Sequence, residues 1–209
     1  MKPTTPKPQA KTRAKKRKIL EQALQCFSEH GAESTTIDMI CQATDTSVGS
    51  LYHHFGNKEA IAAAVFIEGM RDFSELVMQY LSDIERAELT AEEQAEQGIK
   101  ALVYANVDWI SDNPKWAQFV FHHRGMVSKG GASDKLKSDI GVFYNKLIQL
   151  MGPLIETGVV KKLPAQVYGS FISGPVHEYA RHFLAGRYQS PLNEYREIFA
   201  EGAWRALKS

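Results

Sequence analysis

Apolar side chains recur at helical spacing along this chain, and the first repeat is the clearest. It starts near Ala10, places apolar residues three and four positions apart, and ends at Gly31, a residue that commonly follows the last turn of a helix. Its apolar positions are Ile19, Leu20, Ala23, Leu24 and Phe27. We therefore predict a first helix between residues 10 and 31.

Two shorter repeats follow, each preceded by hydroxyl residues that can cap a helix. Thr36 precedes the apolar pattern of residues 37–41, and the turn-prone residues 44–47 interrupt that pattern. Ser47 can then cap a third helix that runs to about His54. The spacing thus predicts two short helices joined by a turn of about three residues.

A long repeat covers residues 58–82, and further helical patterns fill the rest of the chain. The later helices are expected at residues 90–113, 114–126, 134–157, 164–185 and 191–207, with a kink at Gly152-Pro153. No strand pattern of alternating apolar residues stands out. We predict an all-α fold of about nine helices: an arm at 1–9, a three-helix unit with a helix-turn-helix at 10–56, and a helical bundle at 57–209.

Composition places the chain among ordinary globular proteins, with 44% hydrophobic and 23% charged residues. No apolar run reaches the roughly 18 residues that a membrane span needs, and no apolar signal core follows the basic N-terminus. We expect a cytoplasmic protein. Cys26 and Cys41 both fall in amphipathic segments, so buried thiols are favoured over a disulfide or a redox sensor.

Positive charge gathers at the front of the molecule. Residues 1–20 hold eight Lys or Arg and no acidic side chain, and residues 1–60 carry a net charge of +3 although the whole chain carries +1. Such a cluster attracts the phosphates of nucleic acids, but a solvated tail explains residues 2–9 equally well. Charge alone therefore does not identify the partner.

The segment 35–58 points more specifically to DNA. Two helices joined by a short turn form the unit that lays its second helix in a major groove. Residues 47–54 are then expected to form a solvent-facing helix, while the apolar residues of the segment pack the unit. Taken alone this pattern has low specificity, because many packed helix triplets produce it.

The residues of this region, taken together, resemble the TetR family of transcriptional regulators. The resemblance rests on Ile19–Phe27, Gly31, Thr35-Thr36-Ile37, Ser47–Phe55 and Lys58-Glu59. It implies an all-helical homodimer that binds a palindromic operator with its N-terminal helix-turn-helix and senses an effector through its C-terminal helices. A repressor that a small molecule releases from DNA is the expected function.

The resemblance also implies roles for single residues. Contacts to the DNA backbone are expected from Thr36, Tyr52, His54 and Lys58, and contacts to base edges from Val48, Gly49, Ser50 and His53. Ser47 is expected to face outward. Arg13, Lys16 and Arg17 could reach flanking phosphates or the minor groove, although charge runs are more often solvated. Two alternatives stay open: Tyr52 as a core ring with its hydroxyl at the rim, and His54 as a helix-terminal cap.

The chain departs from the family in the turn, where Asp45-Thr46 replace the usual glycine and apolar residue. Aspartate tolerates the left-handed backbone conformation better than most residues with a side chain, so we expect the turn to form with some strain. The packing at Thr46 and the pitch of the following helix are the features that this departure puts in question.

The resemblance assigns dimerisation to the last two helices and effector binding to the middle ones. The expected dimer contacts are Phe171, Gly174, Val176, Phe183, Phe199 and Trp204, with Ile198 among the further apolar positions of the last helix. A small apolar effector is expected among Tyr104, Trp109, Phe119, His123, Phe143 and His177, of which the two histidines are the polar anchors. A role in the protomer core is the alternative for each of these positions.

Enzymatic and architectural functions are less consistent with the sequence. His177 and His182 lie five positions apart, about 140° around a helix, so they cannot share a metal as the histidines of a helical zinc protease do. No glycine-rich phosphate loop occurs, and no cysteine has a neighbouring histidine. We expect no enzyme activity, no cofactor and no metal. An architectural DNA-bundling protein would not need the long C-terminal core.

Overall fold

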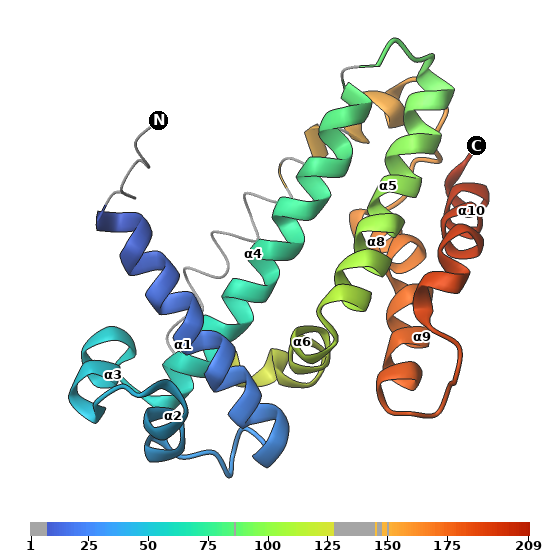
Figure 1. The fold of residues 1–209 in the computed structure, drawn as a ribbon. Coiled ribbons are helices and arrows are strands. Elements are labelled where there is room, and N and C mark those ends of the chain that lie inside the picture. The colour runs from blue at the N-terminus through green and yellow to red at the C-terminus, as the bar shows by residue number, and fades with distance from the viewer. Residues whose placement is uncertain (1–7, 86, 128–144, 146–147, 150) are drawn as a thin grey trace, which may run out of the picture. The chain divides into compact units, whose positions relative to one another are not determined.

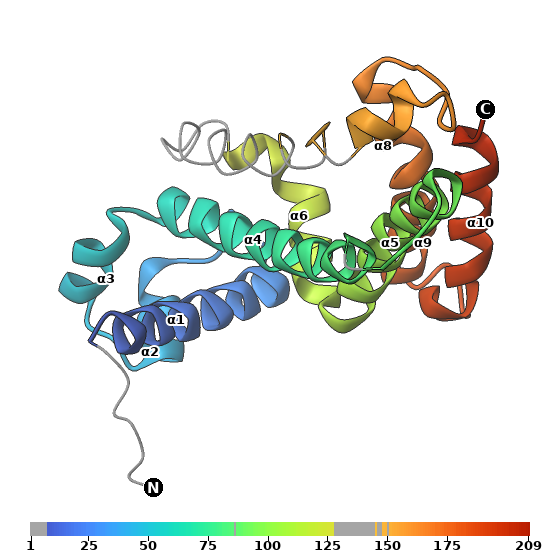
Figure 2. The same ribbon diagram turned by 90° about the horizontal axis from the view of Figure 1, so that it is seen from above.

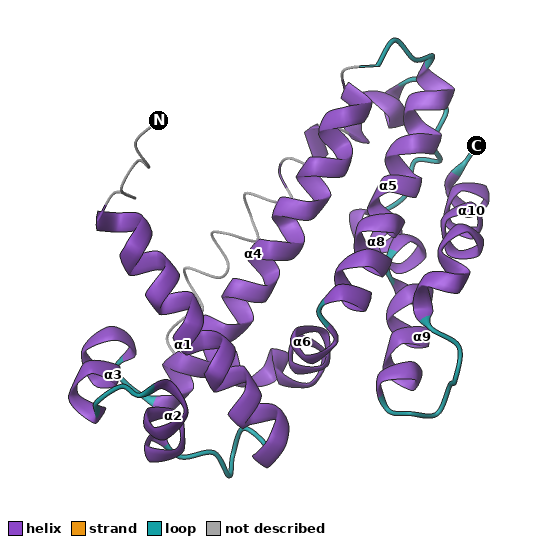
Figure 3. Cartoon of the chain, in the orientation of Figure 1, coloured by secondary structure: helices purple, strands orange, loops and turns teal. Residues whose placement is uncertain are grey.

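Most of the described chain is helical. The computed structural model describes residues 8–85, 87–127, 145, 148–149 and 151–209 (Figures 1 and 3). Nine α-helices and one 3-10 helix have both ends among these residues, residues 151–156 are also helical, and the β pairing described is limited to an isolated bridge between Val160 and Lys208. The predicted all-α fold with an N-terminal helix-turn-helix is confirmed. None of the described helices is long and apolar enough to cross a membrane.

The chain divides into two compact units. The first contains the described residues up to Gly69 and those from Phe119 to Val127, and the second contains Met70–Gln118 and the described residues from 145 onward. Residues 1–7 of the predicted arm lie outside the described residues, and Pro8 already begins a helix. The predicted domain boundaries after residues 9 and 56 remain predictions.

The first unit is built around the long first helix. Figures 1 and 2 both place α1, α2 and α3 side by side. The predicted apolar face of α1 is buried, with exposed fractions of 0–4% at its five apolar positions, and Ile40 and Leu51 bring α2 and α3 into the same core. The helices concerned are α1 (Pro8–His30), α2 (Ile37–Thr44), α3 (Val48–Phe55) and the start of α4 (Lys58–Glu85).

Part of α6 (Pro114–Val127) belongs to this first unit. The ring of Phe119 stacks on Phe27 with a centroid distance of 5.5 Å. His123 lies 4.5 Å from Phe119 and interrupts the helix with φ −112° and ψ 15°. Burial, reinforced by the neighbouring His122, lowers the pKa of His123 below its ordinary value, so a neutral imidazole is favoured at this contact.

The turn between α2 and α3 adopts the conformation that the sequence predicts. Asp45 has φ 48° and ψ 42°, and it is the one non-glycine residue with positive φ among the described residues. The backbone N–H groups of Asp45 and Thr46 both donate to the carbonyl of Cys41. The half-buried Thr46 donates its hydroxyl to the carbonyl of Thr44 at 3.2 Å, so hydrogen bonding takes the place of apolar packing there.

The second unit packs α10 against α5. The buried face of α5 contains Ile99, Val103 and Val107, and Trp204 and Leu207 are the large buried side chains of α10. Backbone pairing of residues 159–161 with Leu207–Ser209 fixes the end of the chain. The elements are α5 (Ala91–Asp112), α8 (Ala165–Ile172), α9 (Gly174–Leu184), η1 (Leu192–Tyr195) and α10 (Arg196–Leu207).

Two predicted helices differ in detail from the structure. The helix expected at 164–185 is two helices that meet at Ser173, because Pro175 lacks an N–H and its ring crowds the carbonyl four residues earlier. The last helix starts with a 3-10 turn before continuing as α10. Of the helix expected at 134–157, residues 134–144 lie outside the described residues and residues 151–156 are helical.

A partly buried ion pair joins three helices of the second unit. Arg196 of α10 donates two hydrogen bonds of 2.9 Å to the carboxylate of Asp108 on α5, and a third of 3.1 Å to the hydroxyl of Tyr80 on α4. Tyr80 in turn donates to Asp108, and this hydrogen bond raises the pKa of the phenol. The guanidinium also lies 3.8 Å from the ring centroid of Tyr104. Two-point pairing of this kind fixes orientation as well as distance.

The left-handed turn gives a stability prediction. Asp45 is exposed, so substitutions there act mainly through the backbone. Asp45→Val places a β-branched residue at φ 48° and should lower the free energy of unfolding by about 1–2 kcal/mol, whereas Asp45→Gly should leave it unchanged or raise it by up to about 1 kcal/mol. Urea unfolding followed by circular dichroism measures both. Equal losses in the two variants would show that the turn carries no backbone strain.

Candidate DNA interface

Helix α3 is held by one face and exposed on the other. Leu51 is 1% exposed and anchors the helix in the first unit, while Val48 and Tyr52 are 42% and 51% exposed. The remaining exposed positions of the segment are Ser47, Gly49, His53 and His54, and Ser50 is half-buried. The expectation that residues 47–54 form a solvent-facing helix is confirmed. The alternative that Tyr52 is a core ring is wrong, because half of its surface is open.

The caps of α2 and α3 leave their hydroxyl protons available. Thr36 accepts from the backbone N–H of Met39 at 3.2 Å, and Ser47 accepts from that of Ser50 at 3.3 Å. A hydroxyl that accepts in this way can still donate its own proton outward. Both residues are exposed, so both can donate to a phosphate oxygen without giving up the cap.

The two histidines and the glycine of α3 are also placed outward. His53 and His54 are exposed, with their ring centroids 5.5 Å apart, and the helix ends when the backbone N–H of Gly56 donates to Tyr52. A methyl group built on Gly49 would meet no atom of the protein within 4 Å. The fold therefore leaves room for a side chain at position 49.

Lys58 begins α4 and has a contact inside the first unit. Its ammonium group donates to the backbone carbonyl of Glu33 at 2.7 Å, and the side chain of Asn57 caps the helix by accepting from Ala60 at 2.7 Å. The charge of Lys58 is not neutralised by a carbonyl, so it still contributes positive potential at this helix start. No sequence pattern predicted the contact with Glu33, which lies 25 residues away.

The basic residues of α1 differ in their surroundings. The guanidinium of Arg17 lies 3.1 Å from Glu21 and 3.7 Å from Glu68 of α4, a carboxylate that is 7% exposed as a residue. The ammonium group of Lys16 lies 5.0 Å from the centroid of the Phe55 ring at the end of α3. The side chain of Arg13 lies outside the described residues. Two neighbouring carboxylates make Arg17 a weaker candidate for a DNA contact than its sequence position indicates.

The expected dimer residues fall into two groups. Phe171 is 41% exposed, and Gly174, Phe183 and Phe199 are half-buried, whereas Val176 and Trp204 are 0% and 4% exposed within the protomer itself. The core alternative therefore describes Val176 and Trp204 better. Ile198, at 67%, is the most exposed large apolar side chain of the second unit's C-terminal helices.

The residues expected around an effector are divided between the two units. Phe119 and His123 belong to the first unit, and Phe143 lies outside the described residues. The others belong to the second unit, where each has a partner. Tyr104 donates to Glu197 at 2.8 Å, Trp109 lies edge-on to Phe73 at 5.8 Å, and the Nε2 of His177 lies 3.0 Å from the Oδ1 of the buried Asn106.

The residues considered for catalysis are also engaged separately. His182 lies 3.2 Å from Glu178, whereas His177 lies against Asn106, as their five-residue spacing predicts. No three metal-binding side chains come together within the described part of the chain. Burial raises the thiol pKa of both Cys26 and Cys41, which disfavours the reactive thiolate.

Comparison with known proteins agrees with this geometry. Residues 19–65 match the family model described as bacterial regulatory proteins, tetR family. The HTH-type transcriptional repressor AcnR of Corynebacterium glutamicum is 39% identical over 64 residues, which are 31% of this chain and 34% of AcnR. The chain thus matches about a third of the length of this curated relative.

Solved structures extend the likeness to the whole fold. A TetR family transcription regulator from Marinobacter aquaeolei VT8 superimposes with a TM-score of 0.73 at 18% identity, covering 96% of this chain and 99% of that one. FadR from Bacillus subtilis, solved in complex with stearoyl-CoA, gives 0.65 at 17% identity, with 90% and 96% covered. Residues 19–65 thus match the tetR family model, and the described chain has the fold of solved TetR-family regulators.

Proposed function

We propose that this protein is a ligand-responsive transcriptional repressor that binds a palindromic operator as a homodimer in the cytoplasm. The observation that carries the proposal is the exposed face of α3, a capped helix that follows a helix-turn-helix turn and presents apolar and polar side chains to solvent. The chemistry of this exposed face suits a major groove.

The groups of this interface divide into those that would position the DNA and those that would specify its sequence. Thr36, Tyr52, His54 and Lys58 bring hydroxyl groups, an imidazole and an ammonium group to the edge of the unit, where they would bind phosphates. Val48 would contact a thymine methyl group, and Ser50 and His53 would form hydrogen bonds to base edges. Gly49 would let the backbone approach the duplex closely.

A homodimer follows from the size of the recognition element. An eight-residue helix reads few base pairs, and a second copy on the next helical turn supplies the remaining specificity. Phe171 of α8 and Ile198 of α10 are the exposed apolar side chains that favour these helices as the interface. Gly174, Phe183 and Phe199 would add contacts at its edge.

A small apolar effector is the proposed signal. FadR of Bacillus subtilis shares the fold and was solved with stearoyl-CoA, which supports an acyl ligand as the first class to test. In the second unit, Tyr104, Trp109 and His177 offer aromatic surface with polar groups, and their present partners would have to rearrange around a ligand. In the first unit, the contact between His123 and Phe119 would change when the effector binds.

The experiment that tests the function is selection of bound DNA from a random duplex pool by the purified full chain. We expect an inverted repeat with half-sites about one helical turn apart, two protomers per duplex by light scattering, and release by an acyl-CoA. Binding that falls steeply with salt should accompany the specific complex. Enrichment of no sequence, or a monomer on a single half-site, would overturn the proposal.

The two roles on α3 are separable by mutation. Tyr52→Ala should weaken binding about equally on the selected operator and on a scrambled duplex, because a phosphate contact carries no sequence information. His53→Ala should lower the ratio of operator to scrambled affinity by about five- to a hundredfold, the cost of one base contact of about 1–3 kcal/mol. Fluorescence anisotropy at one fixed salt concentration measures both. Matching losses on both duplexes for both variants would contradict this division.

Gly49 separates stability from binding. Gly49→Ala should raise the free energy of unfolding by about 0.5–1 kcal/mol, because alanine favours a helix and its methyl group meets no atom of the protein. The same variant should bind the operator less tightly, since the methyl group would stand between the backbone and the duplex. Thermal unfolding and anisotropy on one sample compare the two effects. If the variant is more stable and binds the operator as tightly as the wild-type protein, Gly49 does not contribute to the interface.

A further inference from the structure

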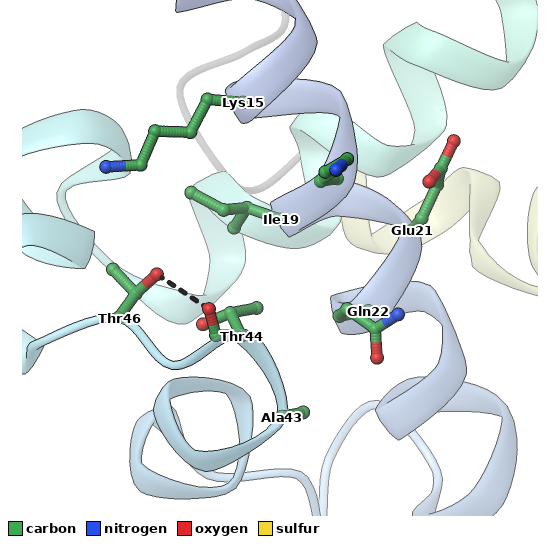
Figure 4. A pocket seen from close by; sticks show the side chains of 8 residues that line it. Lys15, Ile19, Glu21, Gln22, Ala43, Thr44 and Thr46 are labelled. Carbon is green, nitrogen blue, oxygen red and sulfur yellow. Dashed lines mark hydrogen bonds between the residues drawn. The ribbon is translucent and has the colours of Figure 1, made fainter.

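An open depression lies between α1 and the turn that joins α2 to α3. The turn directly precedes α3, but none of the DNA contacts proposed above lines the depression. Its volume is about 470 Å³. Figure 4 shows α1 side chains on one side and the turn on the other, with Lys15 extending over the turn toward Thr46. The polar groups that matter in it are Lys15, Lys18, Glu21, Gln22, Thr44 and Thr46.

The hydroxyl donors of the turn are already used inside the protein. Thr44 donates its hydroxyl to the carbonyl of Ile40 at 2.8 Å, and Thr46 donates its own to the carbonyl of Thr44 at 3.2 Å. The Cys41 carbonyl accepts the backbone N–H of Thr46 at 3.1 Å. These carbonyls have partners, so the turn has no evident need of a cation to satisfy them.

The side-chain donors of α1 that line the depression, in contrast, have no partner among the described residues. Lys15, Lys18 and Gln22 are exposed and form no ion pair or hydrogen bond with any of the described residues. The one carboxylate of the depression belongs to Glu21, and it is paired with Arg17 at 3.1 Å. Two ammonium groups and a free amide around a concave surface form a donor set for an anion with several oxygens.

We propose that this depression binds a phosphate of the DNA backbone through Lys15 and Lys18. The inference rests on the proposed function and adds a contact outside the recognition helix. DNA is the anion that the location favours, because the depression is lined by the turn whose next residue, Ser47, caps α3. Lys16 and Arg17 do not share this role, since the first lies over Phe55 and the second faces Glu21 and Glu68.

The salt dependence of binding tests the site. The operator selected as above is titrated with the full chain, with Lys15→Gln, Lys18→Gln and the double variant, and with Lys162→Gln as the control, an exposed lysine of the second unit with no partner among the described residues. The double variant should lower the magnitude of the slope of log K against log salt by about 0.9, the value for one lost phosphate contact. Its ratio of operator to scrambled affinity should stay unchanged. Thermal unfolding should match wild type, because the side chains are exposed.

A second arm locates the phosphate. Duplexes carrying one neutral methylphosphonate at successive positions should weaken wild-type binding at a position that flanks the bases read by α3. At that position the double variant should lose no further affinity, which is the non-additivity of two groups in contact. Losses that add at every position would mean that the lysines act only through their long-range field, and this result would overturn the proposal.

The outcomes separate the two proposals. If the wild-type protein binds the operator and the double variant shows an unchanged salt slope, the phosphate site is ruled out and the proposed repressor function stands. Wild-type protein that selects no duplex sequence removes the function and this inference with it. A Lys162→Gln control that changes the slope as much as the double variant also counts against a local site.

Discussion

The burial of Leu51 is the constraint on which the DNA interface depends. Helix α3 has eight residues, which is too short for a helix to be stable by itself in water. Leu51, at 1% exposure, contributes about 1.5–3 kcal/mol by its burial, and the cap at Ser47 adds about 1 kcal/mol. Because one side chain fixes which face points inward, it also fixes which residues point outward. A rotation of α3 that exposed Leu51 would withdraw Val48 and Tyr52.

The first helix supports this arrangement from several sides. Its apolar face forms the core, Lys16 lies over Phe55 at the end of α3, and Arg17 pairs with Glu68 of α4. The carboxylate of Glu68 is nearly inaccessible to solvent, so removal of Arg17 would take a close cation away from a buried charge. Net charge over residues 1–20 therefore overstates what is available to DNA. Within the described residues, Lys15 and Lys18 are the α1 cations that face an open depression.

What the sequence predicted well is what is decided locally. The helices of the first unit follow from three- and four-residue spacing, and their starts follow from Thr36 and Ser47, which accept from residues three positions ahead. Even the left-handed turn follows from the tolerance of Asp45 for that conformation. Pro175 is also a local signal for the helix break before α9, although the apolar repeat across this position favoured one continuous helix.

What the sequence did not predict depends on contacts between distant positions. Tyr104 and Glu197 are 93 residues apart, His177 and Asn106 are 71 apart, and Arg196 and Asp108 are 88 apart. An aromatic or a histidine at helical spacing looks the same whether it lines a pocket or satisfies a buried amide. The side chains expected around an effector were therefore recognisable by type, but their partners were decided by tertiary packing.

Local departures from good folding gather in one stretch of this chain, and their position is informative. Asp45 occupies a backbone conformation that glycine adopts more easily, and Gly49 stands in a helix where alanine would fit. Val48 and Tyr52, on the same helix as the buried Leu51, expose apolar surface to solvent. Each choice lowers the stability of the isolated protomer. Sequences that are otherwise locally consistent concentrate such departures where another molecule binds. These departures support the interface that we propose at residues 45–52, on grounds that do not depend on a resemblance to a known family.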